Sequence, residues 1–175
     1  MPDPNTTTQT PPVEAQNSFS YEYGVDVKIG DQWQPIRFIT GVNPSVEPKE
    51  QDGATYDDKG APHPIKTGEE PQLEFSQQLR RLADGNYLPE TEELLKATKP
   101  GATGNKATVI VRYYDKPASG KPNPGDAYEL TGTVSAQRAE TGNDALAALN
   151  FTIKGQGPRR QIANPYTPPA ENPGA

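Results

Sequence analysis

Proline and glycine limit the length of any regular element in this chain, because 20 prolines and 16 glycines fill 36 of its 175 positions. Proline lacks a backbone N–H and fixes φ, so it interrupts helices and the interior of sheets. Nine of the prolines lie in two polar terminal segments, residues 1–16 and 156–175. Neither segment holds enough apolar side chains to offset the entropy of ordering itself. The sequence therefore predicts a folded region over residues 17–155 between an N-terminal arm and a C-terminal arm.

The folded region has the patterns of β-structure. Residues 21–29 (YEYGVDVKI) alternate apolar and polar side chains, as a half-buried strand does. Residues 106–114 (KATVIVRYY) form the window richest in β-branched and aromatic residues. Further strands are predicted over residues 32–40, 73–82, 126–138 and 146–154. Six or seven short strands favour a mainly-β fold, predicted as a β-sandwich of two packed antiparallel sheets.

One flanking α-helix is predicted over about residues 89–98. Pro89 suits the first helical position, and Glu90, Glu92 and Glu93 place negative charge in the first turn. The dipeptide Pro100-Gly101 ends the pattern. A helix of about ten residues depends on packing against a sheet.

A long polar segment, residues 50–70 (EQDGATYDDKGAPHPIKTGEE), separates two of the expected strands. Its main apolar side chains are those of Tyr56 and Ile65. Connections of this length in a compact domain are commonly functional. We expect a long extended loop that meets another molecule.

The composition excludes several classes of function. The chain has no cysteine and a single histidine, which excludes a disulfide scaffold, thiolate catalysis and cysteine-ligated zinc. No stretch approaches the 18–20 apolar residues of a membrane-spanning helix. The net charge of −6 argues against a protein that grips nucleic acid phosphates.

Catalytic candidates are weak. Acid–base catalysis needs two carboxyl groups in different environments, whereas neighbours in sequence share one. His63 lies between two prolines, where neither a partner nor a dry pocket is indicated. Nucleotide-binding glycine motifs and a nucleophile elbow are absent from the sequence. We expect a protein that is not an enzyme and uses no cofactor or metal; a carboxylate hydrolase is the weaker alternative. Three acidic pairs are the candidates for such catalysis or for a carboxylate-only Mg²⁺ or Ca²⁺ site, an alternative that the composition leaves open: Asp57-Asp58, Glu69-Glu70 and Glu92-Glu93.

The order of features along the chain resembles a known family. A polar start and two strands precede a loop with TYDD and a following KTG, then LEFS and the helix. TVIVRYYD and YELTGTVSAQRAETGNDALAALNFTIKGQGPRR follow, before a polar tail. This order resembles the major tail protein (tail tube protein) of long-tailed, non-contractile bacteriophages (siphophages), especially those of actinobacteria.

The resemblance implies a structural virion protein, made in the host cytoplasm and located in the phage tail tube. Six such subunits form a ring whose sheets join into an inner β-barrel, and stacked rings conduct DNA during ejection. The implied partners are further copies of the chain, the tape measure protein, and the tail terminator and distal tail proteins. Genomic DNA passes through the lumen without specific binding, and no membrane is involved.

The resemblance places contacts between subunits on the long loop and on both arms. We hypothesise that the two arginines of the C-terminal arm pair with the acidic loop of a neighbour. Glu74, Glu129 and Asp126 are candidates for the lumen because they lie on predicted strands. The inter-subunit candidates are Tyr56, Asp57, Asp58, Lys59, His63, Arg159 and Arg160.

A second interpretation stays open, a monomeric β-sandwich binding module of the carbohydrate-binding or adhesion type. Such a module needs an exposed aromatic platform or groove. Most aromatic residues of this chain fall on expected core-facing strand positions.

Overall fold

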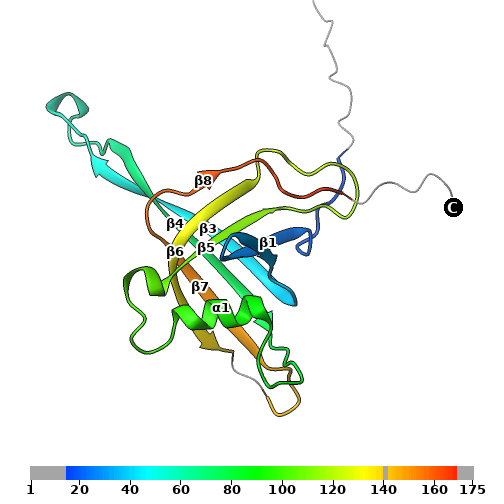
Figure 1. The fold of residues 1–175 in the computed structure, drawn as a ribbon. Helices are drawn as coiled ribbons and strands as arrows, with labels where there is room; N and C mark the ends of the chain where they lie inside the picture. Colours follow the sequence, from blue (N-terminus) through cyan, green and yellow to red (C-terminus); the bar gives the residue numbers. More distant parts are fainter. Residues whose placement is uncertain (1–14, 140–141, 169–175) are drawn as a thin grey trace, which may run out of the picture.

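The computed structural model describes residues 15–139 and 142–168, which form one curled antiparallel sheet with one α-helix against it (Figure 1). Seven strands follow one another in the order β2-β1-β5-β6-β7-β4-β3, and β8 pairs with β6. The elements are β1 (Tyr23–Ile29), β2 (Gln32–Pro35), β3 (Ile39–Asp52), β4 (Pro64–Gln78), α1 (Pro89–Ala97), β5 (Thr108–Asp115), β6 (Ala127–Arg138), β7 (Ala148–Gly155) and β8 (Arg160–Gln161).

The mainly-β fold with one flanking helix is confirmed, and the helix lies where its capping pattern predicts it. The described strands, however, join into one curled sheet where two separate sheets were expected. The reason is β6, which pairs with β5 over residues 127–133 and with β7 over residues 132–138. One long strand thus belongs to both halves of the sheet.

The core lies between α1 and the inner face of the sheet. Leu94 on α1 is fully buried against strand residues from both halves. Burial of such side chains, each worth about 1.5–3 kcal/mol, is the main term that holds the short helix in place. The buried strand residues of this core are Val25, Val27, Leu73, Phe75, Val109, Val111, Tyr113, Leu130, Leu149, Phe151 and Ile153.

A glycine pair marks the point where β6 passes from β5 to β7. Gly132 and Gly155 are register partners on β6 and β7. A Cβ atom on Gly132 would overlap the backbone carbonyl of Lys154, and one on Gly155 would lie 2.7 Å from Cγ of Pro71. Glycine is required here by the close approach of two backbones.

We expect Gly132→Ala to lower the free energy of unfolding by about 2–3 kcal/mol, because overpacking against backbone cannot relax through a rotamer change. Urea unfolding measures this loss. Gly41→Ala is the matched control, since a Cβ at Gly41 on β3 meets no atom within 4 Å. Equal losses in the two variants would contradict a specific role for the close approach.

The chain turns sharply between β2 and β3, where one continuous strand over residues 32–40 was predicted. Glu90 on α1 accepts hydrogen bonds from Nε of Arg37 at 2.8 Å and from its Nη2 at 3.1 Å. Gln77 Nε2 donates to the carbonyl of Arg37 at 2.9 Å. These bonds fix the backbone at Arg37, and the next residue, Phe38, takes a φ of 60°. The interruption depends on a carboxylate 53 residues away, which no local pattern reveals.

The polar segment over residues 50–70 is strand at both of its ends, over residues 50–52 and 64–70, where an extended loop was expected throughout. β3 and β4 stay paired as far as Asp52 and Pro64, although β7 accompanies β4 only over Gln72–Gln78. The remainder projects from the sheet as a two-stranded extension (Figure 1, upper left). We call residues 46–71 the ribbon and residues 53–63, which connect its strands, the tip.

The described part of the C-terminal segment lies against the subunit's own sheet. β8 pairs with Tyr128 and Glu129 of β6, and Nδ2 of Asn164 donates to the carbonyl of Asp115 at 2.9 Å. Residues 1–14 and 169–175 of the predicted arms lie outside the described residues, as do residues 140–141 between β6 and β7. The division into arms and domain stays a prediction.

Candidate assembly surfaces

The outer face of β3, β4, β7 and β6, which we call the polar face, lies opposite the core. Residues of these strands alternate between core and solvent, so every second side chain belongs to this face. These side chains are polar and mostly uncharged. Ser76 Oγ donates to Oδ1 of Asn150 at 2.7 Å, and Gln72 Nε2 donates to Oε1 of Glu74 at 2.7 Å. The face comprises Asn43, Ser45, Gln72, Glu74, Ser76, Thr133, Ser135, Gln137, Asn150 and Thr152, without an aromatic ring.

The three lumen candidates from the sequence lie in different places. Glu74 is on the polar face. Glu129 is on the same side of β6 but is bonded to Arg160 at 2.9 Å. Asp126 precedes β6 and accepts a hydrogen bond from the hydroxyl of Tyr23 at 3.1 Å.

The polar face ends in two open strand edges. β3 is the last strand of the sheet on one side. On the other side β5 pairs with β6 only as far as Thr133, so residues 134–138 have β7 beside them and no further strand among the described residues. β3 and β6 run in opposite directions, because three antiparallel pairings separate them.

Two prolines, Pro44 and Pro48, lie on the open edge strand β3. Pro44 and Pro48 face Leu73 and Glu69 in the register with β4. Gln78 N donates to the carbonyl of Phe38, so the even-numbered residues of β4 bond toward β3. After the register shift between Ile39 and Gly41 their partners are odd-numbered β3 residues, so Pro44 and Pro48 direct their backbone groups outward. Proline there leaves the pairing with β4 intact and removes outward donors, which limits indiscriminate pairing of the open edge.

The tip is closed by two carboxylates, that of Asp52 at the end of β3 and that of Asp58 within the tip. Asp52 Oδ1 accepts hydrogen bonds from the backbone N–H groups of Ala54 at 2.9 Å and His63 at 3.2 Å. Asp58 Oδ2 accepts from the backbone N–H of Thr55 at 2.7 Å and from its hydroxyl at 3.0 Å. These bonds lower the pKa of both carboxyl groups, since they favour the charged forms. Nδ1 of His63 lies 3.5 Å from Oδ1 of Asp58.

The closed tip presents Tyr56 and Asp57 to solvent. The side chain of Tyr56 is fully exposed, at 103% of its reference area, and Asp57 is exposed beside it. Lys59 takes a left-handed φ of 50° and ends the short 3₁₀ turn. The five tip residues singled out from the sequence therefore lie together in the tip, and their contact with a second subunit stays a prediction.

The other two candidates, Arg159 and Arg160, lie at the base of the ribbon and have partners within the subunit. Arg159 stacks 4.1 Å over the ring of Tyr128, and its Nε lies 3.9 Å from Glu69 Oε1. Arg160 bonds to Glu129. Both arginines thus have a carboxylate partner within the subunit and do not require one from a neighbouring subunit.

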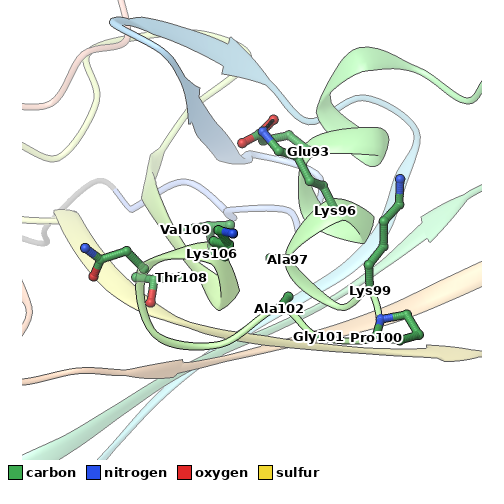
Figure 2. A pocket seen from close by; sticks show the side chains of 11 residues that line it. Glu93, Lys96, Ala97, Lys99, Pro100, Gly101, Ala102, Lys106, Thr108 and Val109 are labelled. Carbon is green, nitrogen blue, oxygen red and sulfur yellow. Dashed lines mark ion pairs between the residues drawn. The ribbon is translucent and has the colours of Figure 1, made fainter.

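The groove in Figure 2 lies between α1 and the start of β5 and has a volume of about 510 Å³. Glu93 and Lys96 in its wall form a helix-surface pair at 3.5 Å, and Lys99 and Lys106 add positive charge. These groups contain no nucleophile with a neighbouring base. Among residues 15–139 and 142–168, no three His, Asp or Glu side chains are grouped to hold a metal ion. Within the same ranges no helix is long and apolar enough to cross a membrane.

This curled sheet, with one helix on the core side and a polar outer face, is a tail-tube-like fold. The chain is similar to the tail of an empty gene transfer agent (GTA) particle with C6 symmetry, at a TM-score of 0.60 and 10% identity, over 85% of this chain and 100% of that one. It is also similar to a chain in the virion of a native GTA particle, at a TM-score of 0.59, 10% identity and the same coverage. A chain in the 6-fold symmetrised baseplate of the anti-feeding prophage matches at a TM-score of 0.51 and 12% identity, over 86% and 98% of the two chains. The sequence itself matches no family model and no curated protein.

Proposed function

We propose that this chain is the tube subunit of a phage-type tail, and that six copies form a ring and stacked rings form the conduit for DNA ejection. The observation that supports it best is the polar face with its two open edges, on a tail-tube-like fold. The proposed location is the virion, with the tape measure, tail terminator and distal tail proteins as partners.

Ring formation would join β3 of one subunit to β6 of the next. The two edges run in opposite directions, so the new pair is antiparallel like the pairs within the subunit. A head-to-tail contact of this kind generates a ring when the rotation closes, and closure leaves no free edge. The six-fold symmetry of the GTA tail and of the anti-feeding prophage baseplate supports a ring of six.

The polar face would then line the lumen. Nucleic acid is held by cations at its phosphates and by aromatic rings that stack on its bases. The residues named for the polar face include no aromatic ring and no cation. Lys49 and Lys154 lie beside Ser45 and Gln72 of this face, and Lys49 is paired with Glu70 at 2.8 Å. Six copies, each with a net charge of −6, carry a formal charge of −36. DNA is therefore expected to slide along this surface without being held.

Sedimentation velocity and negative-stain microscopy of the purified chain at rising concentration test the proposal. Rings or tubes with a central channel are the expected result. A strict monomer that binds glycans would instead support the alternative of a carbohydrate-binding or adhesion module.

We expect replacement of residues 53–63 by Asn-Gly to leave rings intact and to reduce tubes about tenfold or more, as the loss of a contact worth 1.4 kcal/mol or more would do. The subunit should still fold, because Asp52 and Pro64 are register partners that a two-residue turn can connect. Microscopy counts rings and tubes. An eleven-residue Gly/Ser loop at the same place separates the sequence of the tip from its length, and wild-type tubes from the Asn-Gly variant would contradict the assigned role.

A further inference from the structure

Three arginines without a carboxylate partner gather at one end of the subunit. The chain has seven arginines. Four of them lie within 4 Å of a carboxylate of the same chain: Arg37, Arg112, Arg159 and Arg160. The other three, Arg80, Arg81 and Arg138, are exposed and form no ion pair with any described carboxylate.

Aromatic side chains hold these three guanidinium groups. Arg80 lies 4.8 Å over the ring of Phe38, and Arg81 lies 5.2 Å over the ring of Tyr87. Arg81 and Arg138 both donate to the hydroxyl of Tyr87, at 3.5 and 3.3 Å. Arg80 Nη2 also donates to Oε1 of Gln78 and Arg81 Nη1 to the carbonyl of Gly85, both at 3.3 Å. Stacking on a ring orients a guanidinium, and its positive charge stays without a carboxylate partner among the described residues. We call Arg80, Arg81, Arg138, Phe38 and Tyr87 the arginine cluster.

Two carboxylates close in sequence to Tyr87, Asp84 in the loop and Glu92 on α1, already accept hydrogen bonds. Asp84 accepts hydrogen bonds from the backbone and the side chain of Asn86, and Glu92 accepts one from the backbone N–H of Tyr87. The positive charge of the cluster is therefore available to a partner.

Phe38 is held in the cluster against its conformational preference. A φ of 60° is rare for a bulky residue and costs of the order of 1–3 kcal/mol. The bonds of Arg37 to Glu90 and Gln77 enforce it, and the ring of Phe38 remains 45% exposed. A strained, exposed ring beneath an unpaired cation is typical of a surface that binds another molecule.

The arginine cluster and the tip lie at opposite ends of β4. That strand has 15 residues, so its ends are about 50 Å apart at 3.4 Å per residue. Figure 1 shows the tip at one extreme of the molecule, and the loop that follows β4, the end of β6 and the start of β7 at the other. The tip offers the exposed ring of Tyr56 and the exposed carboxylate of Asp57, and Glu50 at the adjoining end of β3 adds a second exposed carboxylate; no partner is described for either carboxylate. Complementary surfaces at opposite ends are what head-to-tail stacking requires.

We infer that the arginine cluster receives the tip of a second copy of this chain in the adjacent ring. The carboxylates of Asp57 and Glu50 face the guanidinium groups, and Tyr56 supplies a further ring for them to stack on. This inference rests on the proposed tube function. It assigns the receiving surface to Arg80, Arg81 and Arg138 in place of Arg159 and Arg160.

The test reverses charge at the receiving surface. Arg80→Glu with Arg81→Glu should leave rings intact and reduce the mass of tubes about tenfold or more, since opposed like charges at an interface cost several kcal/mol. Adding Glu50→Lys and Asp57→Lys to the same chain should restore tubes. Lys96→Glu with Lys99→Glu, an equal charge change at exposed positions in the last turn of α1 and just beyond it, is the matched control and should assemble as wild type.

The outcomes separate the inference from the proposed function. Tubes of wild-type yield from the Arg80/Arg81 variant, or no recovery in the charge-swapped chain, would overturn the inference while rings and tubes of the wild type still support the function. A wild-type chain that forms neither rings nor tubes would remove the proposed function itself. A gel-shift assay with a 20-base-pair DNA duplex tests nucleic acid as an alternative partner of the arginine cluster. If the wild type binds the duplex and the Arg80/Arg81 variant does not, the cluster is a nucleic acid site and the inference is overturned. Equal thermal unfolding of all variants establishes that each one folds.

Discussion

Replacing Glu90 with alanine is expected to lower the free energy of unfolding by about 3 kcal/mol, the lower end of the range for breaking a buried ion pair. The side chain of Glu90 is fully buried, and it accepts hydrogen bonds from the backbone N–H, Nε and Nη2 of Arg37. The guanidinium of Arg37 is 48% exposed, so it can regain water after the change, which places the loss at the low end. Urea unfolding followed by the fluorescence of Trp33, the single tryptophan, measures it.

The matched control lies one turn further along the same helix. Glu93 pairs with Lys96 at the helix surface, and Glu93→Ala should change stability by no more than about 0.5 kcal/mol. Glu90→Met combined with Arg37→Met should recover most of the loss, because it removes both partners of the pair together. A Glu90→Ala variant as stable as Glu93→Ala would contradict the role given to the buried pair.

The buried pair also connects the stability of the subunit to its assembly. Gln77, which contacts Arg37 through its side-chain amide, accepts a hydrogen bond from the hydroxyl of Thr91 at 3.1 Å. This network ties α1 to the turn that places Phe38 beneath Arg80. Conditions in which Glu90→Ala remains folded should therefore still show fewer tubes, since the receiving surface loses its fixed geometry.

Local signals made the helix and most strands predictable from the sequence. Pro89, the acidic first turn and Pro100-Gly101 act within a few residues of one another, and alternation marks each strand that has one buried face. The same local pattern predicts Glu90 only as a favourable negative charge in the first turn of the helix. Its burial and its pairing with Arg37 depend on the sheet that the helix covers, and no pattern within the helix encodes that sheet.

The ribbon was missed as strand for a physical reason. Its residues from Glu47 to Asp52 are exposed, so neither face selects apolar side chains and no alternation appears. The single curled sheet likewise depends on the register of β6 with two partners, which sequence periodicity does not contain. The tip residues could be singled out because they share one segment, whereas the arginine cluster draws on three segments that meet only after folding.

A proline at position 136 is expected to block ring formation while leaving the subunit folded. Gln156 N donates to the carbonyl of Thr131 and Ala139 N to the carbonyl of Ala148, so odd-numbered residues of β6 bond toward β7. The N–H of Ala136 therefore points to the open edge and has no place in the pairing with β7. Ala136→Pro removes a donor that the neighbour's β3 would use, at a small cost from the fixed φ.

Gln137→Pro is the matched control, because the N–H of Gln137 belongs to the pairing with Asn150 on β7. Loss of this backbone hydrogen bond in Gln137→Pro should lower the free energy of unfolding by about 2 kcal/mol or more. The free energy of unfolding of Ala136→Pro should stay within about 1 kcal/mol of the wild-type value. Sedimentation velocity should show about tenfold fewer rings for Ala136→Pro, as expected when an interface loses a hydrogen bond worth about 1.4 kcal/mol. Normal rings from a stably folded Ala136→Pro chain would exclude the β6 edge as the joint between subunits. The two substitutions, Ala136→Pro and Gln137→Pro, are at adjacent positions. Lost rings with normal stability for the first, and lost stability for the second, would therefore separate a failure to assemble from a failure to fold.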